Sequence, residues 1–411
     1  MRGAPRGVDL VSRWFKIRLG DRRQRPGFML YSVRSLALFL FLVLDSVTSI
    51  GTSRRNGPVV VAGATGYIGR AVVRELVKRK IPTYAIVRSQ NSMSEITRAC
   101  LQGSNIIECD SLDPEDVDRT ILFIRPSSLI NCLASRNGLP ADSWAVDYGG
   151  GVNLLKSLLI SSQQNTMGNA NAPCHYVMLS AFCCGKPELQ FQFAKLKLEE
   201  ELQRASGAYL THSIVRPTAY FKSLDGQLEA AKKGNPILYF GTGSCAANAI
   251  SEEDLAVFLV ESALNPGKIG MVNKIRNIGG PDVPPISKLE QIGLIFDALD
   301  IPKEKRKTIS IPVGVFQILI SFFSFLQRAT GTVGLKDIAQ KCEDASEIVR
   351  IVRYYATEPM VAINEGEVQG RIRLADHFCN IAGRGGCLLE IDQYTTTTGV
   401  IDMVLKNDYV K

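Results

Sequence analysis

The chain has 411 residues, of which 45% are hydrophobic and 21% charged. This balance indicates an ordinary globular protein without a long disordered region. Much of the net charge of +8 comes from basic residues near the N-terminus, so it does not predict nucleic-acid binding. The ten cysteines have no metal-ligand spacing and there are only three histidines. We therefore expect a reduced, intracellular-type protein without a metal site or histidine-based catalysis.

Residues 1–57 have the features of a targeting segment. Ser35–Leu44 is an apolar run too short to span a bilayer comfortably, and the small residues Ser46–Ser49 after it suit a cleavage site. If translation starts at Met29 rather than Met1, Arg34 supplies the basic start of a secretory signal. A single membrane anchor is the alternative.

The stretch from Pro58 to Ser89 has the pattern of a dinucleotide-binding unit. Pro58–Ala62 is predicted as a buried strand, Tyr67–Lys80 as an amphipathic helix and Pro82–Val87 as a second strand. The glycines between the first strand and the helix, spaced G-x-x-G-x-x-G, permit a sharp turn and close approach to a pyrophosphate at the helix N-terminus. The loop residues expected to contact the cofactor are Gly63, Thr65, Gly66, Tyr67, Ile68 and Gly69.

A basic residue at the end of the second strand bears on the choice of cofactor. NAD-binding units usually carry Asp or Glu there for the ribose hydroxyls, but this chain has Arg88. A cation suits a 2′-phosphate, so the sequence favours NADPH. The alternative is a solvated surface arginine.

Strands and helices continue to alternate, which predicts an α/β fold with a Rossmann-like, doubly wound parallel sheet. The expected strands are Ser104–Cys109, Leu129–Ala134, His175–Ser180, Thr211–Val215 and Asn273–Ile278, and the expected helices are Ala141–Leu159 and Gln190–Leu202. Ligands bind at the carboxyl ends of such strands. The further cofactor-binding candidates, on this basis, are Asp110, Ser135, Ser180, Lys195 and Pro217. For Asp110 a helix cap is the alternative.

The C-terminal third alternates less clearly. We expect residues 58–220 to form the NADP-binding domain and residues 221–411 a smaller substrate-binding part that is interleaved with the sheet. Ser251–Asp254 has the pattern of a helix start. Pro312–Leu326 is apolar on most faces; burial is the commoner arrangement, and a helix that docks on a membrane is the alternative.

The Ser, Tyr and Lys set of many reductases on this sheet is incomplete in this chain. In those enzymes a Tyr four residues before the Lys donates the proton. Ser180 and Lys195 fit the set, but Phe191 stands at the Tyr position. Either the chain is a non-catalytic descendant, or it reduces a conjugated C=C bond, whose carbanion is delocalised. Lys195 is expected to hold the nicotinamide ribose, with a solvated lysine as the alternative.

Several segments stand in a characteristic order: GATGYIGRAVVREL, NCLASRNGLPADSWAVDY, LSAFCCGKPELQFQFAKLKLEEEL, SIVRPTAYFKSLDGQ, ISEEDLAVF, NIGGP and RYYATEPM. Over residues 58–360 they resemble the NADPH-dependent divinyl chlorophyllide a 8-vinyl-reductases, a family of atypical short-chain dehydrogenases. That family also has Phe at the position of Phe191, which agrees with the resemblance.

The resemblance implies hydride transfer from NADPH to the 8-vinyl group of divinyl chlorophyllide or protochlorophyllide, giving an 8-ethyl product in a plastid. The N-terminus then resembles a bipartite targeting sequence, and peripheral association with plastid membranes is an open question, as is the oligomeric state. Tyr220 and Lys195 are the candidate proton donors. The candidate substrate-binding residues are Arg136, Trp144, Phe182, Phe221 and Lys222, with core packing as the alternative for each. Arg136 or Lys222 is a candidate to pair with the substrate propionate.

Two other functions remain open at this point. One is reduction of a C=C bond in a different NADPH-dependent reaction, and the other is a non-catalytic scaffold that binds NADPH. The intact glycine loop and Lys195 argue against the scaffold.

Overall fold

The computed structural model of the protein describes residues 57–167 and 173–384. The predicted targeting segment therefore lies outside the described residues, apart from Gly57. Within the described residues, no helix combines the length and the hydropathy needed to cross a membrane.

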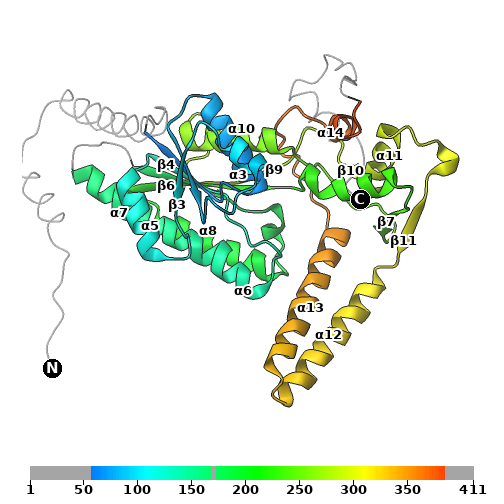
Figure 1. The fold of residues 1–411 in the computed structure, drawn as a ribbon. Coiled ribbons are helices and arrows are strands. Elements are labelled where there is room, and N and C mark those ends of the chain that lie inside the picture. The colour runs from blue at the N-terminus through cyan, green and yellow to red at the C-terminus, as the bar shows by residue number, and fades with distance from the viewer. Residues whose placement is uncertain (1–56, 168–172, 385–411) are drawn as a thin grey trace, which may run out of the picture. The chain divides into compact units, whose positions relative to one another are not determined.

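A seven-stranded parallel sheet lies at the centre of the fold (Figure 1). Its strands, in the spatial order β3-β2-β1-β4-β5-β6-β9, are β3 Asn105–Glu108, β2 Thr83–Val87, β1 Val59–Ala62, β4 Ser128–Asn131, β5 Cys174–Leu179, β6 Leu210–Pro217 and β9 Lys274–Ile278. Neighbouring strands all pair in parallel. The strand order reverses between β1 and β4, where sheets of this kind bind their ligands. The predicted doubly wound fold is confirmed.

Helices cover both faces of the sheet. Because successive side chains of a strand point to opposite faces, Val59 and Val61 of β1 join one core cluster while Val60 joins another. The helices on the first face are α3 Tyr67–Lys78 and α10 Glu252–Leu264, and those on the second are α5 Pro114–Ile124, α7 Gly151–Met167 and α8 Gln190–Ala205. Ser251 caps α10, as expected, by accepting a hydrogen bond from the Asp254 amide.

The helix predicted over Ala141–Leu159 is not regular. It starts as α6 Pro140–Asp142, widens into a π-helical segment η1 at Ser143–Gly150, and continues as α7. Residues within η1 that face inward include Ser143 and Asp147, whereas Trp144 is 40% exposed. The π-helical segment thus buries the polar residues Ser143 and Asp147 and leaves the aromatic Trp144 partly exposed. Such segments often mark functional sites.

The C-terminal part has a core of its own, built around Phe221, Phe296 and Phe378. Its elements are η3 Phe221–Leu224, α9 Asp225–Lys232, β7 Ile237–Phe240, β8 Ala246–Ala247, β10 Ile286–Ser287, α11 Lys288–Ala298, η4 Lys303–Lys305, β11 Thr308–Ile311 and α14 Leu374–Ile381. Strands β7 and β11 pair in parallel, and β8 and β10 pair antiparallel. The remaining short elements are α4 Glu95–Cys100 and η2 Phe182–Gly185.

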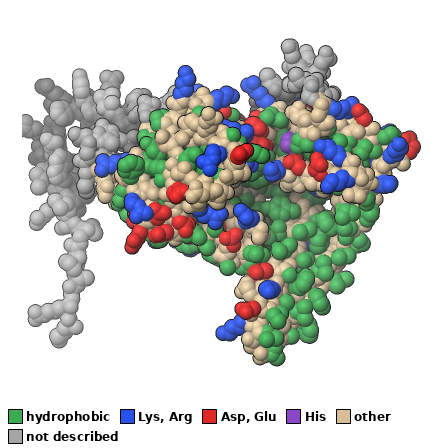
Figure 2. Space-filling model, in the orientation of Figure 1, with side chains coloured by type: hydrophobic (Ala, Val, Ile, Leu, Met, Phe, Trp, Pro, Cys, Tyr) green, Lys and Arg blue, Asp and Glu red, His purple; other side chains and the backbone are tan. Residues whose placement is uncertain are grey.

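Two long helices, α12 Gly314–Thr332 and α13 Lys336–Thr357, pack against each other as a hairpin (Figure 1). Within α12 only Phe316 and Ile320 are buried. The expectation that Pro312–Leu326 is buried is therefore wrong: α13 and, at Phe316, Phe240 of β7 cover part of α12 and leave its other apolar side exposed. Hydrophobic side chains gather along this hairpin in Figure 2.

Candidate active site

The glycine loop between β1 and α3 is tightly constrained. Gly63 has φ +71°, and a Cβ there would lie 2.6 Å from the Cys132 carbonyl oxygen. A Cβ on Gly69 would lie 2.1 Å from the Gly63 carbonyl oxygen, so only glycine lets the helix sit so close to the loop. Gly66 donates its amide hydrogen bond to the Gly63 carbonyl oxygen at 3.0 Å.

Helix α3 begins directly after this loop without a side-chain cap and without an acidic residue in its first turn. Its first amides therefore face the loop, where a phosphate is favoured by hydrogen bonding and by the helix dipole. Thr65 is exposed on the loop, while Ile68 is buried beneath it in the core. The loop residues fit the pyrophosphate of a dinucleotide.

The strand ends beside the loop carry the other cofactor candidates. Arg88 is exposed directly after β2. Asp110 is exposed after β3 and accepts a hydrogen bond from the Leu112 amide at 3.0 Å. The cap of α5 is Asp113, so the helix-cap alternative for Asp110 is wrong. Pro217 is buried at the end of β6.

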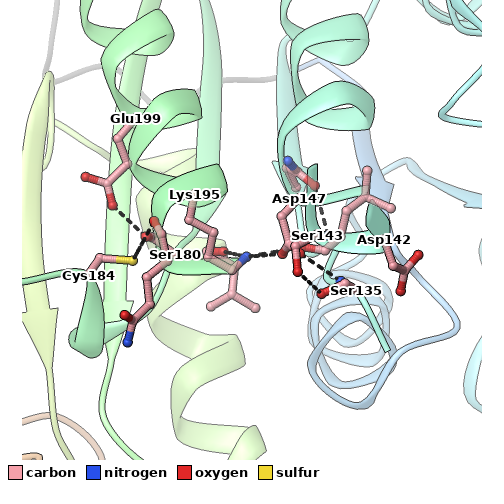
Figure 3. A network of polar contacts seen from close by, with 12 residues as sticks. Ser135, Asp142, Ser143, Asp147, Ser180, Cys184, Lys195 and Glu199 are labelled. Carbon is pink, nitrogen blue, oxygen red and sulfur yellow. Dashed lines mark hydrogen bonds and ion pairs between the residues drawn. The ribbon is translucent and has the colours of Figure 1, made fainter. Parts of the chain in front are cut away.

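Lys195 is a buried charged residue held by three partners at the sheet edge (Figure 3). Its Nζ lies 2.9 Å from Asp147 Oδ1 and donates to the carbonyl oxygens of Leu133, at 3.5 Å, and Leu179, at 3.3 Å. The side chain is only 8% exposed, so the alternative of a solvated lysine is wrong. Asp147 Oδ2 also accepts the Ser135 amide at 3.1 Å. Lys195 thus ties α8 to η1 and to the ends of β4 and β5.

The charge state of Lys195 follows from two opposing effects. Burial is the largest single effect and lowers its pKa, but the adjacent Asp147 carboxylate, together with Cys184 and Cys183, raises it, so that the net pKa is raised. The ammonium group therefore stays protonated near neutral pH. A fixed cation of this kind suits binding and charge stabilisation better than proton donation.

Ser180 takes part in a second buried network. Its hydroxyl donates to Glu199 Oε1 at 2.5 Å, and the same carboxylate pairs with Arg216, whose Nε lies 2.9 Å away. The Ser180 hydroxyl is thus engaged by a carboxylate in this structure (Figure 3). On the other side of the site, Ser135 Oγ and Ser143 Oγ lie 3.2 Å apart.

Tyr67, which follows the glycine loop, is close to two candidates at the start of η3, Tyr220 just before it and Lys222 within it. The rings of Tyr67 and Tyr220 meet edge to face with centroids 6.1 Å apart, and Lys222 Nζ lies 5.2 Å from the centre of the Tyr67 ring. Tyr67 in turn donates a hydrogen bond to Glu252. Burial raises the pKa of both tyrosines, so both keep their protons. The structure therefore brings Tyr220 and Lys222 to the cofactor loop.

The remaining substrate candidates differ in their surroundings. Trp144 is half-exposed and donates from Nε1 to Gln190 Oε1 at 3.0 Å, and Phe182 is half-buried near the same end of α8. Arg136 is exposed, with its backbone amide bonded to Asp142 at 3.1 Å. Phe221 is fully buried in the C-terminal core, which favours the core-packing alternative for this residue.

Sequence reasoning missed three charged residues of the site: Asp147, Glu199 and Arg216. Asp147 and Glu199 are buried acids, and a buried acid requires a cation or several hydrogen bonds. Their signal in the sequence was weak, because the charged partner of each lies on a different element: Lys195 of α8 for Asp147 of η1, and Arg216 of β6 for Glu199 of α8.

The fold and the site together define a class of protein. A dinucleotide loop, a topological switch point and a buried lysine at the sheet edge are the parts of an NAD(P)H-dependent enzyme of the short-chain dehydrogenase type. A family model described as NAD(P)H-binding matches residues 63–266.

Curated relatives specify the family. The chain is 35% identical to divinyl chlorophyllide a 8-vinyl-reductase, chloroplastic, of Arabidopsis thaliana over 370 residues, covering 83% of this chain and 82% of the relative. It is 38% identical to the protein of the same name from Zea mays, covering 74% and 72%. The chain belongs to the divinyl chlorophyllide a 8-vinyl-reductase family, as the sequence motifs predict.

Solved structures share the fold at low identity. AtPrR2 with NADP+ and (+)pinoresinol is 12% identical with a TM-score of 0.55, covering 79% of this chain and 99% of that chain. UDP-glucose 4-epimerase from Thermotoga maritima is 16% identical with a TM-score of 0.50, covering 62% and 85%. These likenesses support the Rossmann-like architecture.

Proposed function

We propose that this protein reduces the 8-vinyl group of divinyl chlorophyllide a, or of divinyl protochlorophyllide, to an ethyl group with NADPH. The observation that carries the NADPH-dependent part of the proposal is the uncapped glycine loop combined with the buried Lys195–Asp147 pair at the same sheet edge. Relatives named for this reaction match over most of their length. A scaffold would not need to keep a buried cation beside the cofactor loop.

The residues present fit NADPH. Gly63, Gly66 and Gly69 would hold the pyrophosphate at the N-terminus of α3, and Arg88 is placed to meet a 2′-phosphate after β2. Lys195 would bind the nicotinamide ribose. When bound, NADPH supplies the hydride, and the protein must orient the vinyl group, exclude water and deliver a proton.

The substrate would lie between the loop after β4 and η3. Trp144 and Phe182 offer half-buried aromatic surface for a flat macrocycle, and each belongs to an element beside Lys195. Arg136 and Lys222 are exposed cations that suit the propionate of the pigment.

We further propose that the protein works in a plastid and docks on its membranes through α12. The apolar side of α12 exposes Ile318 by 70% and Phe325 by 67%. Between Lys305 and Lys336 the sequence contains basic residues but no acidic one. An apolar helix face with basic flanks is the pattern of a helix that binds an anionic lipid surface.

An absorbance assay tests the proposed reaction. Purified protein, with and without residues 1–57, is mixed with NADPH and divinyl chlorophyllide a. We expect a blue shift of the Soret band in both preparations, because the targeting segment takes no part in the site. Bound NADPH without any shift would contradict the vinyl-reductase function and favour a scaffold.

A further inference from the structure

Helix α13 reaches the place where the usual catalytic tyrosine is missing. A Cβ on Gly138 would lie 3.6 Å from Phe191 Cδ1 and 2.9 Å from Ile351 Cδ1, so Phe191 of α8 and Ile351 of α13 both lie against this glycine. Tyr355 follows Ile351 by four residues and so lies one turn further along the same side of α13. The helix thus carries a phenol group towards the position that Phe191 leaves without one.

Contacts along its length fix α13 at this place. The Gln190 amide donates a hydrogen bond to Glu347 at 2.8 Å, and two ion pairs join Arg353 to Glu188 and Glu358 to Lys186, both at 2.6 Å. The Tyr354 hydroxyl donates to the carbonyl oxygens of Lys186, at 2.8 Å, and Cys183, at 3.2 Å. All of them join α13 to η2, to the loop after it or to the start of α8. The position of Tyr355 is therefore set by neighbours on both sides of it.

The Tyr355 hydroxyl lies beside Cys183 and Tyr220 and holds a proton. It donates a hydrogen bond to the Cys183 thiol and lies close enough to Tyr220 for their charges to interact. Burial is the main cause that raises the pKa of Tyr355, although the residue as a whole is 46% exposed. The group therefore keeps its proton near neutral pH while the outer edge of the residue remains in contact with water.

The other two candidates are less suitable. Lys195 is committed to Asp147 and to two backbone carbonyls. Tyr220 packs edge to face on Tyr67, on the side of the glycine loop. Tyr355, by contrast, lies one helical turn beyond Ile351, which shares the Gly138 contact with Phe191.

We propose that Tyr355 donates the proton that completes the reduction, in place of the tyrosine that Phe191 replaces. The inference rests on the proposed function. Two electrons and one hydrogen reach one vinyl carbon as hydride, with NADPH oxidised to NADP+. The O–H bond of Tyr355 then breaks while a C–H bond forms at the carbanion, and the phenolate regains a proton from water. The charge of Lys195 extends to Cys183, the hydrogen-bond partner of Tyr355, and so favours a negative charge in this region.

Adjacent tyrosines provide a matched test. Tyr355→Phe removes only the proposed donor, Tyr354→Phe removes only anchoring hydrogen bonds, and Tyr220→Phe removes the competing phenol. For each full-length variant, kcat and KM with divinyl chlorophyllide a, NADPH affinity by fluorescence, Tm and the solvent deuterium effect on kcat are measured. We expect Tyr355→Phe to lower kcat about 100-fold with unchanged KM and NADPH affinity, since general acids contribute at least this much. Its solvent deuterium effect rises, because proton delivery from water becomes slow.

The controls make the outcome decisive. Tyr354→Phe should lower Tm while keeping most of kcat. The assignment is overturned if Tyr355→Phe keeps kcat within about threefold of the parent, far less than a lost general acid would cost. It is also overturned if Tyr354→Phe or Tyr220→Phe loses as much kcat. Failure of the parent protein to reduce the pigment at all would instead overturn the proposed function, and this assignment with it.

Discussion

The parallel sheet and the α12–α13 hairpin bury their apolar residues to very different degrees. Val59, Val60 and Val61 of β1 are completely buried, whereas Ile318 and Phe325 of α12 are 70% and 67% exposed. In the sheet, apolar residues hold the fold together and position polar groups at the carboxyl edge. In α12 much of the apolar surface stays exposed and so contributes little to the free energy of folding. This surface is available to bind a partner. Substitutions in the sheet should therefore change the stability of the fold, whereas substitutions on the exposed side of the hairpin should change its binding to membranes.

The largest loss of stability is expected for Lys195→Met. The substitution leaves the Asp147 carboxylate buried without its cation, which typically costs about 3–5 kcal/mol of unfolding free energy. NADPH binding should weaken as well. Lys197→Met on the same helix is the matched control, because its ion pairs are at the surface and worth less than about 1 kcal/mol. Equal urea midpoints for the two variants would show that the buried pair does not hold the site.

A slightly smaller loss is expected for Gly69→Ala. The new Cβ would lie 2.1 Å from the Gly63 carbonyl oxygen, and such overpacking costs about 1–3 kcal/mol. Because α3 must move away from the loop, NADPH affinity should fall too. Gly226→Ala in α9 meets nothing within 4 Å and should leave both quantities unchanged or improve stability slightly. Isothermal titration with NADPH separates the two variants.

A pH dependence of the unfolding free energy, intermediate in size, should come from His212 in β6. Burial lowers its pKa to about 4 from the ordinary value of 6.5, so the folded state binds this proton less readily than the unfolded state does. Its contribution to stability is fully present above the unfolded pKa and is lost as pH falls towards the folded pKa. Between about pH 7 and about pH 5 this amounts to about 2 kcal/mol. Denaturation curves of His212→Gln at several pH values should show an unfolding free energy that falls less steeply between pH 7 and pH 5 than that of the parent protein. An equal fall in both proteins would contradict the prediction.

The smallest effect on stability is expected in the hairpin. Ile318→Ala should change the unfolding free energy by less than about 0.5 kcal/mol, since the side chain is already exposed. On vesicles that contain anionic lipids, however, it should weaken binding about tenfold through lost apolar contact. Ile320→Ala, two residues along the same helix at a buried position, should show the reverse pattern. Unchanged vesicle binding by Ile318→Ala would argue against α12 as the docking surface.

The same contrast explains what the sequence could predict. Local patterns were enough for the seven parallel strands, for the glycine loop and for the Ser251 cap. The π-helical turn that aims Asp147 at Lys195 depends on packing between segments far apart in the chain, so the local pattern predicted only a regular helix over Ala141–Leu159. For α12 the apolar pattern predicted a helix correctly. The pattern could not show how much of the helix other elements cover, so it did not predict that most of its apolar residues stay exposed. The same limit applies to Tyr355, which only the docking of α13 brings to the site.

Isotope labelling tests the central claim most directly. The purified protein is given divinyl chlorophyllide a and NADPH that carries deuterium at the transferable position, and the pigment is analysed by mass spectrometry and NMR. The account predicts an 8-ethyl product whose new ethyl group contains a single deuterium from the cofactor and a hydrogen from water. Unreduced pigment in the presence of bound NADPH, or a product without the label, would contradict it.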